Sequence, residues 1–161
     1  MRKQKGFSLI ELLIVVAIIL IIAAIAIPNL LRARMAANES SAVGSIRTLN
    51  TAEVTYNSSY PTVGFATSLA QLGGTGGACT PTSAGSCLID SVLTAGTKSG
   101  YTFGAAATAS TPQNNYSVFG NPTAPGQTGV RSFCSYEDAV VRATTAAATL
   151  AACPVATAPL S

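Results

Sequence analysis

The sequence predicts an α+β fold in which a long N-terminal helix, hydrophobic in its first part and amphipathic in its second, packs on a small antiparallel β-sheet. Three observations support this prediction: an uncharged apolar run near the N-terminus, a helical period that continues beyond it, and alternating segments separated by Gly and Pro in the second half. A chain of 161 residues has room for one small domain beyond the helix.

The apolar run is long enough to cross a membrane. No charged residue occurs from Leu12 to Leu31, and a helix of that length covers roughly 30 Å, the thickness of the hydrocarbon layer. A secretory signal has a shorter apolar region, with its cleavage site after that region. Here the small residue that suits cleavage, Gly6, comes before the run, so cleavage would remove the basic leader and leave the anchor in place.

Glu11 lies inside the apolar segment that begins at Phe7, and a carboxylate inside an apolar membrane helix is costly. If Phe7 became the N-terminus, its amine would lie one helical turn from Glu11 on the same face. In a packed array of such helices, the amine of one chain would equally meet Glu11 of a neighbour. The alternative is that Glu11 lies near the membrane surface and is simply solvated there.

The residues around Glu11 carry a resemblance to a known family. The stretch Lys5-Gly6-Phe7-Ser8-Leu9-Ile10-Glu11-Leu12-Leu13 resembles the processing site of type IV pilins and type II secretion pseudopilins, and the resemblance continues to Ala26-Ile27-Pro28-Asn29. It covers about the first third of the chain and implies cleavage between Gly6 and Phe7 by a membrane prepilin peptidase. N-methylation of Phe7 and extraction into a helical filament would follow.

Beyond Pro28 the helix is expected to become one-sided and to run from Phe7 to about Tyr56. The expected buried stripe is Leu31, Met35, Ala42, Ile46, Leu49 and Tyr56, with Arg32, Arg34, Asn38, Glu39, Ser45 and Arg47 on other faces. Pro28 removes a backbone donor, which predicts a kink or local melting with a role in assembly or, alternatively, a bend with no such role. The predicted organisation is a leader at 1–6, a transmembrane and filament-core helix at 7–31 and a globular head at 32–161.

The head is expected to begin with a loop-like stretch from Thr62 to Gly100, containing a glycine run at 73–77 and a short helix at Thr67 to Leu72. The glycine run lacks the Lys of a phosphate-binding loop, so we interpret it as a surface loop. Four strands are predicted, at residues 99–105, 115–119, 130–135 and 139–143. They form an antiparallel meander with one face covered by the amphipathic part of the helix, and the tail from Thr144 is expected to be irregular.

The sequence contains four cysteines and no histidine. Their spacing does not suit a zinc site, and outside the membrane an even number of cysteines indicates disulfides. Three pairings are possible. We expect Cys79–Cys87 and Cys134–Cys153, because each closes a local loop and the second pins the tail; a disulfide-bounded C-terminal loop also resembles many pilins.

Charge and composition bear on several function classes. Removing Arg2, Lys3 and Lys5 from the nine basic residues leaves six, which balance the six acidic ones, so nucleic acid is not expected as the main partner. No histidine is present to act as a base, and no catalytic, cofactor or metal site is predicted. Glu137-Asp138 offers too few oxygens for the calcium site attributed to major pseudopilins, which favours a pilin.

The resemblance therefore implies a major structural subunit of a type IV pilus, serving adhesion, twitching motility or DNA uptake. Its expected partners are other copies of itself, the prepilin peptidase, the inner-membrane assembly platform and, before assembly, the membrane. The precursor would reside in the inner membrane and the product in an extracellular filament. The alternatives are a type II secretion pseudopilin and a membrane-anchored binding protein that does not polymerise.

Overall fold

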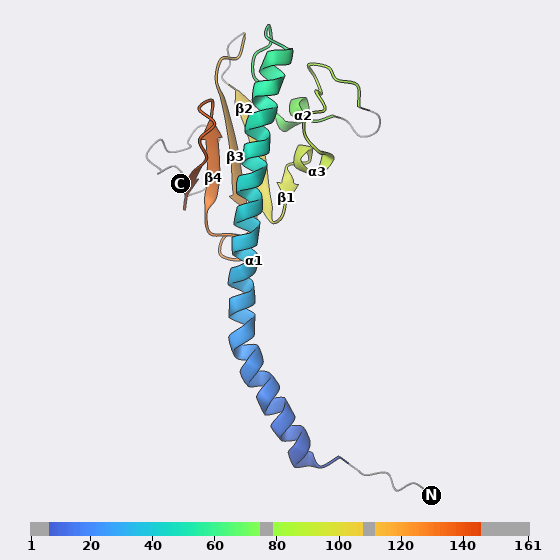
Figure 1. Cartoon of the computed structure of the whole chain (residues 1–161), viewed down its shortest axis with the longest axis vertical. Helices are drawn as coiled ribbons and strands as arrows, with labels where there is room; N and C mark the ends of the chain where they lie inside the picture. The colour runs from blue at the N-terminus through green and yellow to red at the C-terminus, as the bar shows by residue number, and fades with distance from the viewer. Residues whose placement is uncertain (1–6, 75–78, 108–111, 146–161) are drawn as a thin grey trace, which may run out of the picture. The chain divides into compact units, whose positions relative to one another are not determined.

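The α+β class is confirmed by a computed structural model that describes residues 7–74, 79–107 and 112–145 (Figure 1). The chain divides into two compact units, residues 1–34 and 35–161, which we call the stem and the head. The helices are α1 (Leu9–Ser59), α2 (Leu69–Leu72) and α3 (Ser91–Thr94). The strands are β1 (Thr97–Lys98), β2 (Tyr101–Ala107), β3 (Tyr116–Pro122), β4 (Ser132–Tyr136) and β5 (Arg142–Thr144).

Helix α1 belongs to both units. It begins at Leu9 rather than at Phe7, and it ends at Ser59, three residues beyond the predicted end. Pro28 lies inside it without interrupting it, so the local melting considered for this position does not occur. A proline removes only one helical N–H donor, and the hydrogen bonds on either side keep the helix continuous. The predicted boundary between stem and head after Leu31 remains a prediction.

The sheet is an antiparallel meander in the order β1-β2-β3-β4-β5. Two cross-strand pairs of β2 and β3 place a phenylalanine opposite a glycine, Phe103 with Gly120 and Gly104 with Phe119. A Cβ atom on Gly120 would lie 2.8 Å from the ring of Phe103, so the close approach of this ring to the strand requires glycine.

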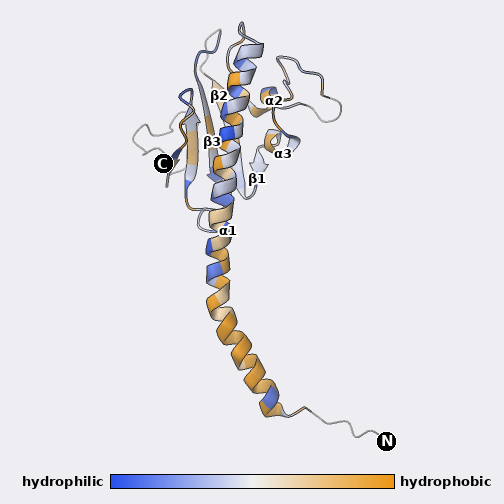
Figure 2. Ribbon diagram, viewed as in Figure 1, coloured by the Kyte–Doolittle hydropathy of each residue, from blue (hydrophilic) through white to orange (hydrophobic). Residues whose placement is uncertain are grey.

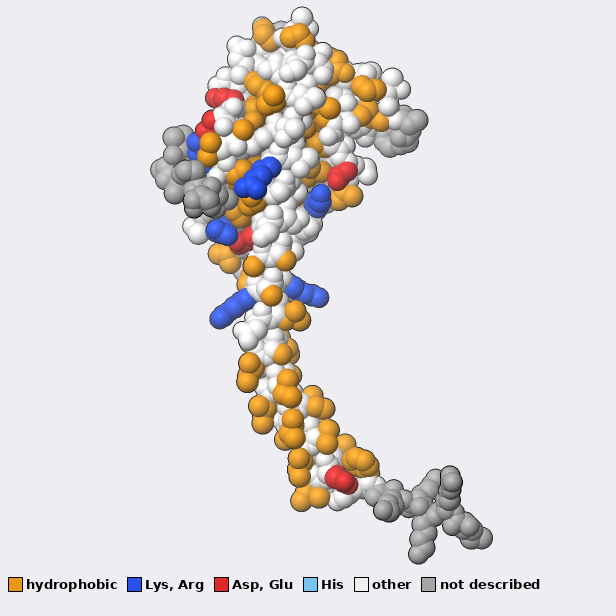
Figure 3. Space-filling model, viewed as in Figure 1, with side chains coloured by type: hydrophobic (Ala, Val, Ile, Leu, Met, Phe, Trp, Pro, Cys, Tyr) orange, Lys and Arg blue, Asp and Glu red, His pale blue; other side chains and the backbone are white. Residues whose placement is uncertain are grey.

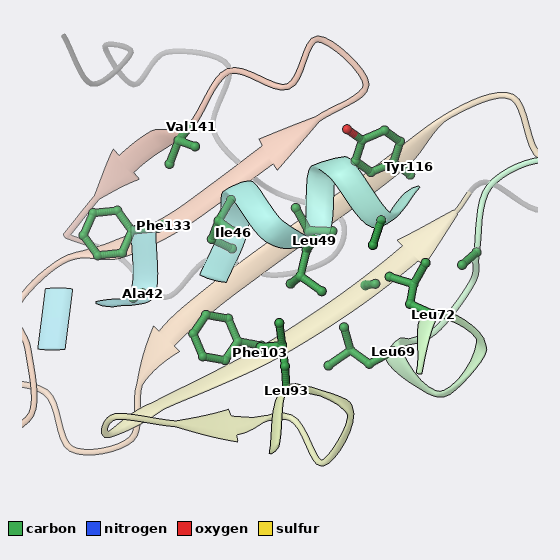
Figure 4. Close-up of a cluster of buried hydrophobic side chains, with 14 of the residues drawn as sticks. Ala42, Ile46, Leu49, Leu69, Leu72, Leu93, Phe103, Tyr116, Phe133 and Val141 are labelled. Atoms are coloured by element: carbon green, nitrogen blue, oxygen red, sulfur yellow. The ribbon is translucent and has the colours of Figure 1, made fainter. Parts of the chain in front are cut away.

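The core lies between one face of this sheet and the second half of α1, as the sequence predicts (Figure 4). From α1 come Ala42, Ile46, Leu49 and Tyr56, and from the strands come Tyr101, Phe103, Val118 and Phe133. Leu69, Leu72 and Leu93 close one side of the core from α2 and α3. Leu31 and Met35 are not part of this buried cluster, so the predicted stripe is correct only from Ala42 onward.

Four details of the head differ from the sequence predictions, and the first is strand β1 (Thr97–Lys98), a fifth strand that lies where a loop was expected. The stretch expected to be loop-like contains α3, whose first turn is capped by the Asp90 carboxylate accepting a hydrogen bond from the Leu93 N–H. The last strand begins at Arg142, because residues 137–141 connect β4 to β5 through a turn in which the Asp138 carboxylate accepts a hydrogen bond from the Val140 N–H. Glu39 and Ser45, predicted on other faces of α1 than the apolar stripe, are buried.

Candidate assembly surface

The N-terminal end of the described chain is an exposed helix start. Phe7 precedes α1, and its side chain is 78% exposed. The Ser8 N–H donates a hydrogen bond of 3.3 Å to Oε2 of Glu11, which is the reciprocal half of a Ser-x-x-Glu capping box. The sequence analysis missed this motif, although Ser8 and Glu11 have the spacing that reveals it. Gly6, on the other side of the predicted cleavage site, lies outside the described residues.

This geometry gives Glu11 two compatible tasks. A carboxylate in the first turn is stabilised by the helix dipole and satisfies a backbone donor that the helix leaves free. Only one of its oxygens is engaged by a described residue, since no described donor is bonded to Oε1. That second oxygen is available to an amine from outside the chain while the first continues to cap the helix.

From Leu12 to Leu31 the stem carries no charged side chain, and its ribbon is coloured as hydrophobic along almost all of this length (Figure 2). Its large aliphatic side chains from Ile10 to Leu31 are between 44% and 65% exposed. By length and composition the helix contains a stretch that can cross a membrane. A helix that is hydrophobic all round requires lipid or other helices around it.

Basic residues follow this apolar surface. Arg32 and Arg34 are exposed, and neither is engaged in an ion pair among the described residues. The described ion pairs involve Lys98 with Asp90 at 3.6 Å, Arg131 with Glu39 at 2.8 Å, and Arg142 with Asp138. All three are formed within the head.

Glu39, on α1, forms hydrogen bonds with the segment that precedes β4. Its Oε1 accepts hydrogen bonds from the backbone N–H groups of Val130 (2.9 Å) and Arg131 (3.2 Å), and its Oε2 accepts one from Nε of Arg131 (2.9 Å). Burial alone raises the pKa of Glu39, but the hydrogen bonds from Val130 and Arg131 outweigh it and hold this pKa below its ordinary value. The ionised carboxylate therefore joins α1 to the segment before β4.

Farther along α1, Asn50 joins the helix to the sheet through buried polar contacts. Its Nδ2 donates to Oγ of Ser135 at 2.9 Å and to the Ala139 carbonyl at 3.3 Å, while its Oδ1 accepts from the Tyr116 hydroxyl at 3.3 Å. Burial is the main cause that raises the pKa of Tyr116, so its hydroxyl remains a donor. These bonds fix the register of α1 on β3 and β4.

The disulfide Cys79–Cys87 is present, with a Cα–Cα distance of 6.1 Å. Within the loop that it closes, the Ser83 carbonyl accepts a 2.6 Å hydrogen bond from the Tyr56 hydroxyl, so α1 holds the loop against the head. The other predicted pair, Cys134–Cys153, includes Cys153, which lies outside the described residues.

The adjacent acidic residues Glu137 and Asp138 form a charged turn. Both oxygens of Asp138 accept from Arg142, which lowers the pKa of Asp138, and Oε1 of Glu137 accepts from Asn115 at 3.4 Å. Among residues 7–74, 79–107 and 112–145, no group of three possible metal ligands occurs. The turn is thus built around Arg142 and Asn115.

Comparison with known proteins places the similarity in the N-terminal region. Residues 1–27 match the family model described as the prokaryotic N-terminal methylation motif. The chain is 68% identical over 40 residues to the major component of the type IV wide pilus of Thermus thermophilus, covering 25% of this chain and 30% of that protein. It is 46% identical over 54 residues to the type IV major pilin protein of Myxococcus xanthus, covering 34% and 24%.

A second group of relatives belongs to secretion systems. The type II secretion system core protein G of Vibrio cholerae is 45% identical over 65 residues, covering 38% of this chain and 44% of that protein. The chain thus matches less than half the length of each of these three relatives. No solved structure shows a significant match to the chain.

Proposed function

The chain carries the N-terminal region of the type IV pilin and type II secretion pseudopilin family, and on this premise we propose that it is the major structural subunit of a type IV pilus. The observation that carries the proposal is the stem part of α1, in which the large aliphatic side chains from Ile10 to Leu31 are exposed and Glu11 is the acidic residue of the first turn. The filament would serve adhesion, motility or DNA uptake, and the subunit would act without catalysis.

Processing prepares this helix for assembly. The prepilin peptidase cleaves between Gly6 and Phe7 and the new amine of Phe7 is methylated, while the stem anchors the protein in the inner membrane. With the inner-membrane assembly platform, the stem then leaves the bilayer and enters an extracellular filament of identical subunits.

The physical basis of cohesion is the exchange of lipid contacts for contacts with other stems. Each aliphatic side chain that is buried contributes about 25 cal/mol per Å² of apolar surface removed from water, so a stem cannot remain exposed once it leaves the membrane. The Phe7 amine of one subunit pairs with the free oxygen of Glu11 in its neighbour. In this role the pair sets the stagger between subunits more than it sets their affinity.

A secretion pseudopilin is the second candidate, and the similarity to core protein G supports it. The pairing of both Asp138 oxygens with Arg142 favours the pilus, because it leaves the Glu137–Asp138 turn with too few oxygens for a calcium shell. Filament length and neighbouring secretion genes distinguish the two. A non-polymerising anchored binding protein would retain the Gly6–Phe7 bond, and the intact mass of the exported protein would show it.

The test of the proposal is Glu11→Val, with Glu137→Val as a control that removes a carboxylate from the head. We expect the Glu11 variant to insert into membranes normally yet to give few filaments, and the control to assemble like the wild type. Electron microscopy of sheared surface filaments and mass spectrometry of their main band measure both. Filaments of normal abundance from the Glu11 variant would contradict the registry role, and a main band that starts at Met1 would contradict the processing.

A further inference from the structure

The apolar part of the stem ends at Arg32 and Arg34, and its length along the helix matches the thickness of the hydrocarbon layer of a bilayer. The uncharged stretch from Leu12 to Leu31 covers about 30 Å along a helix at 1.5 Å per residue, which equals the hydrocarbon thickness. When this stretch spans the membrane, the two guanidinium groups reach the layer of lipid headgroups. Long basic side chains are favoured at this depth because their aliphatic parts remain in the apolar region.

The two arginines also point to different sides of the helix. Positions that are two residues apart are separated by about 200° around an α-helix. Figure 3 shows basic side chains projecting from both sides of the helix where its apolar part ends. A single partner helix contacts only one side, whereas a headgroup layer surrounds the helix and meets both arginines at once.

Within the stem, neither arginine has a counter-ion. The one acidic residue of the stem unit, Glu11, is 21 positions from Arg32, or about 31 Å along the helix. The described ion pairs occupy Lys98, Arg131 and Arg142 instead. A guanidinium group binds phosphate oxygens in a bidentate manner and is well suited to a phosphate layer.

We propose that Arg32 and Arg34 bind the phosphates of membrane phospholipids and thereby fix the depth of the stem in the bilayer before assembly. This inference rests on the membrane stage of the proposed function, and it adds a lipid ligand and two residues that bind it. Entry into a filament then requires these phosphate contacts to be released together with the lipid tails.

The chain contains no tryptophan, so one substitution creates a specific reporter of depth. Ile25→Trp places an indole seven residues before Arg32, about 10 Å farther into the bilayer, at an exposed position of the stem. The full-length reporter chain is reconstituted into phosphatidylethanolamine–phosphatidylglycerol vesicles and into vesicles of a galactolipid that lacks phosphate. Quenching by lipids brominated near the headgroup or near the chain end gives the depth of the indole.

The experiment compares the reporter alone, the reporter with Arg32→Gln and Arg34→Gln, and the reporter with Arg47→Gln as the control on the head. In phospholipid vesicles we expect the double variant to move the indole along the bilayer normal by a few ångströms, up to about one helical turn of 5.4 Å. The control should leave its depth unchanged. In galactolipid vesicles the reporter and the double variant should have the same depth, and added inorganic phosphate should leave the phospholipid result unchanged.

Two results would overturn the inference while leaving the proposed function intact. One is an equal depth of reporter and double variant in phospholipid vesicles. The other is an equal shift in both kinds of vesicle, which would assign the effect to general solvation. Equal depth combined with loss of filaments in cells would assign the arginines to a protein partner instead. If the indole remained in water in every vesicle, the membrane stage itself would be wrong, and the inference with it.

Discussion

Replacing Glu53 by Gln is predicted to stabilise the head in a pH-dependent way. Glu53 lies on α1 with a side chain that is 0% exposed, and its Oε2 accepts one hydrogen bond of 2.9 Å from the Ala66 N–H. Its Oε1 has no hydrogen-bond partner among the described residues. Burial raises the pKa of Glu53 from 4.5 to about 8, and the bond from Ala66 offsets only part of this effect. Burial is the main cause that raises the pKa values of Tyr56 and Tyr116, and the nearby Glu53 carboxylate raises both further.

The size of the effect follows from linkage between protonation and folding. Below pH 4.5 the carboxyl group is protonated in both states, and the substitution should change stability little. Between pH 4.5 and about 8 the unfolded chain releases the proton while the folded chain retains it, so the free energy of unfolding falls by about 1.4 kcal/mol per pH unit. Gln carries no such proton. At pH 7 the Glu53→Gln variant should therefore be more stable than the wild type by on the order of 3 kcal/mol.

Urea unfolding of the full chain in detergent micelles, followed by the near-ultraviolet circular dichroism of its tyrosines, measures this difference. Glu137→Gln is the matched control, because it makes the same chemical change at an exposed position. The stabilisation by Glu53→Gln should increase from about pH 5 to about pH 8 and then level off. A difference that did not change with pH, or a variant less stable than the wild type at about pH 8, would refute the reasoning.

Three further predictions concern the same head and the same unfolding assay. Gly120→Ala should lower the free energy of unfolding by about 1–3 kcal/mol, because the added Cβ would lie 2.8 Å from the buried ring of Phe103. Gly44→Ala should raise it by up to about 1 kcal/mol, because Gly44 lies in a helix and its Cβ would meet open space. Equal effects of the two substitutions would contradict this account of the packing. Glu39→Gln should lower the free energy of unfolding by about 1–3 kcal/mol at neutral pH and by less at acidic pH. The pKa of Glu39 is lowered in the folded state, so the stability that its charge provides is lost as the pH falls through this folded-state value. An equally large effect of the substitution in acid would argue against a role for the charge. Removing the disulfide with Cys79→Ala and Cys87→Ala should cost about 2–3 kcal/mol, and a reductant should destabilise the wild type more than this variant.

The sequence predicts the main elements of the fold because each leaves a periodic pattern. The apolar run and the 3.6-residue period define α1, and the alternation of Tyr101, Phe103 and Ala105 defines β2. The four-residue helix α2 lies within the helix predicted from Thr67 to Leu72, whereas the equally short α3 was missed because its main sequence signal is a single capping residue, Asp90. Cleavage between Gly6 and Phe7 and the assembly roles of Phe7, Glu11 and Pro28 remain predictions.

The burial of two acidic residues of α1 was not predicted, because the prediction relied on their charge and not on their spacing along the helix. Glu39 lies three residues before Ala42, and Glu53 lies four residues after Leu49, so both belong to the buried stripe by spacing. Because acidic residues are usually exposed, Glu39 was predicted on another face of the helix, and no burial was predicted for Glu53. Only the structure shows what each meets there. Glu39 finds two N–H groups and a guanidinium group, whereas Glu53 finds a single N–H.

The acidic residues of the head differ from the charged residues of the stem in the partners that they have within the chain. Each described acidic residue of the head accepts at least one hydrogen bond from another residue of the head, although Oε1 of Glu53 has no partner among the described residues. In the stem, Glu11 has one oxygen without a described partner, and Arg32 and Arg34 have no described ion pair. A fold that pairs its acids internally keeps them when its surroundings change, whereas unpaired charges at the two ends of an apolar helix take their partners from those surroundings. This difference is consistent with the proposed function, in which the stem would move from lipid into a protein filament while the head remains folded.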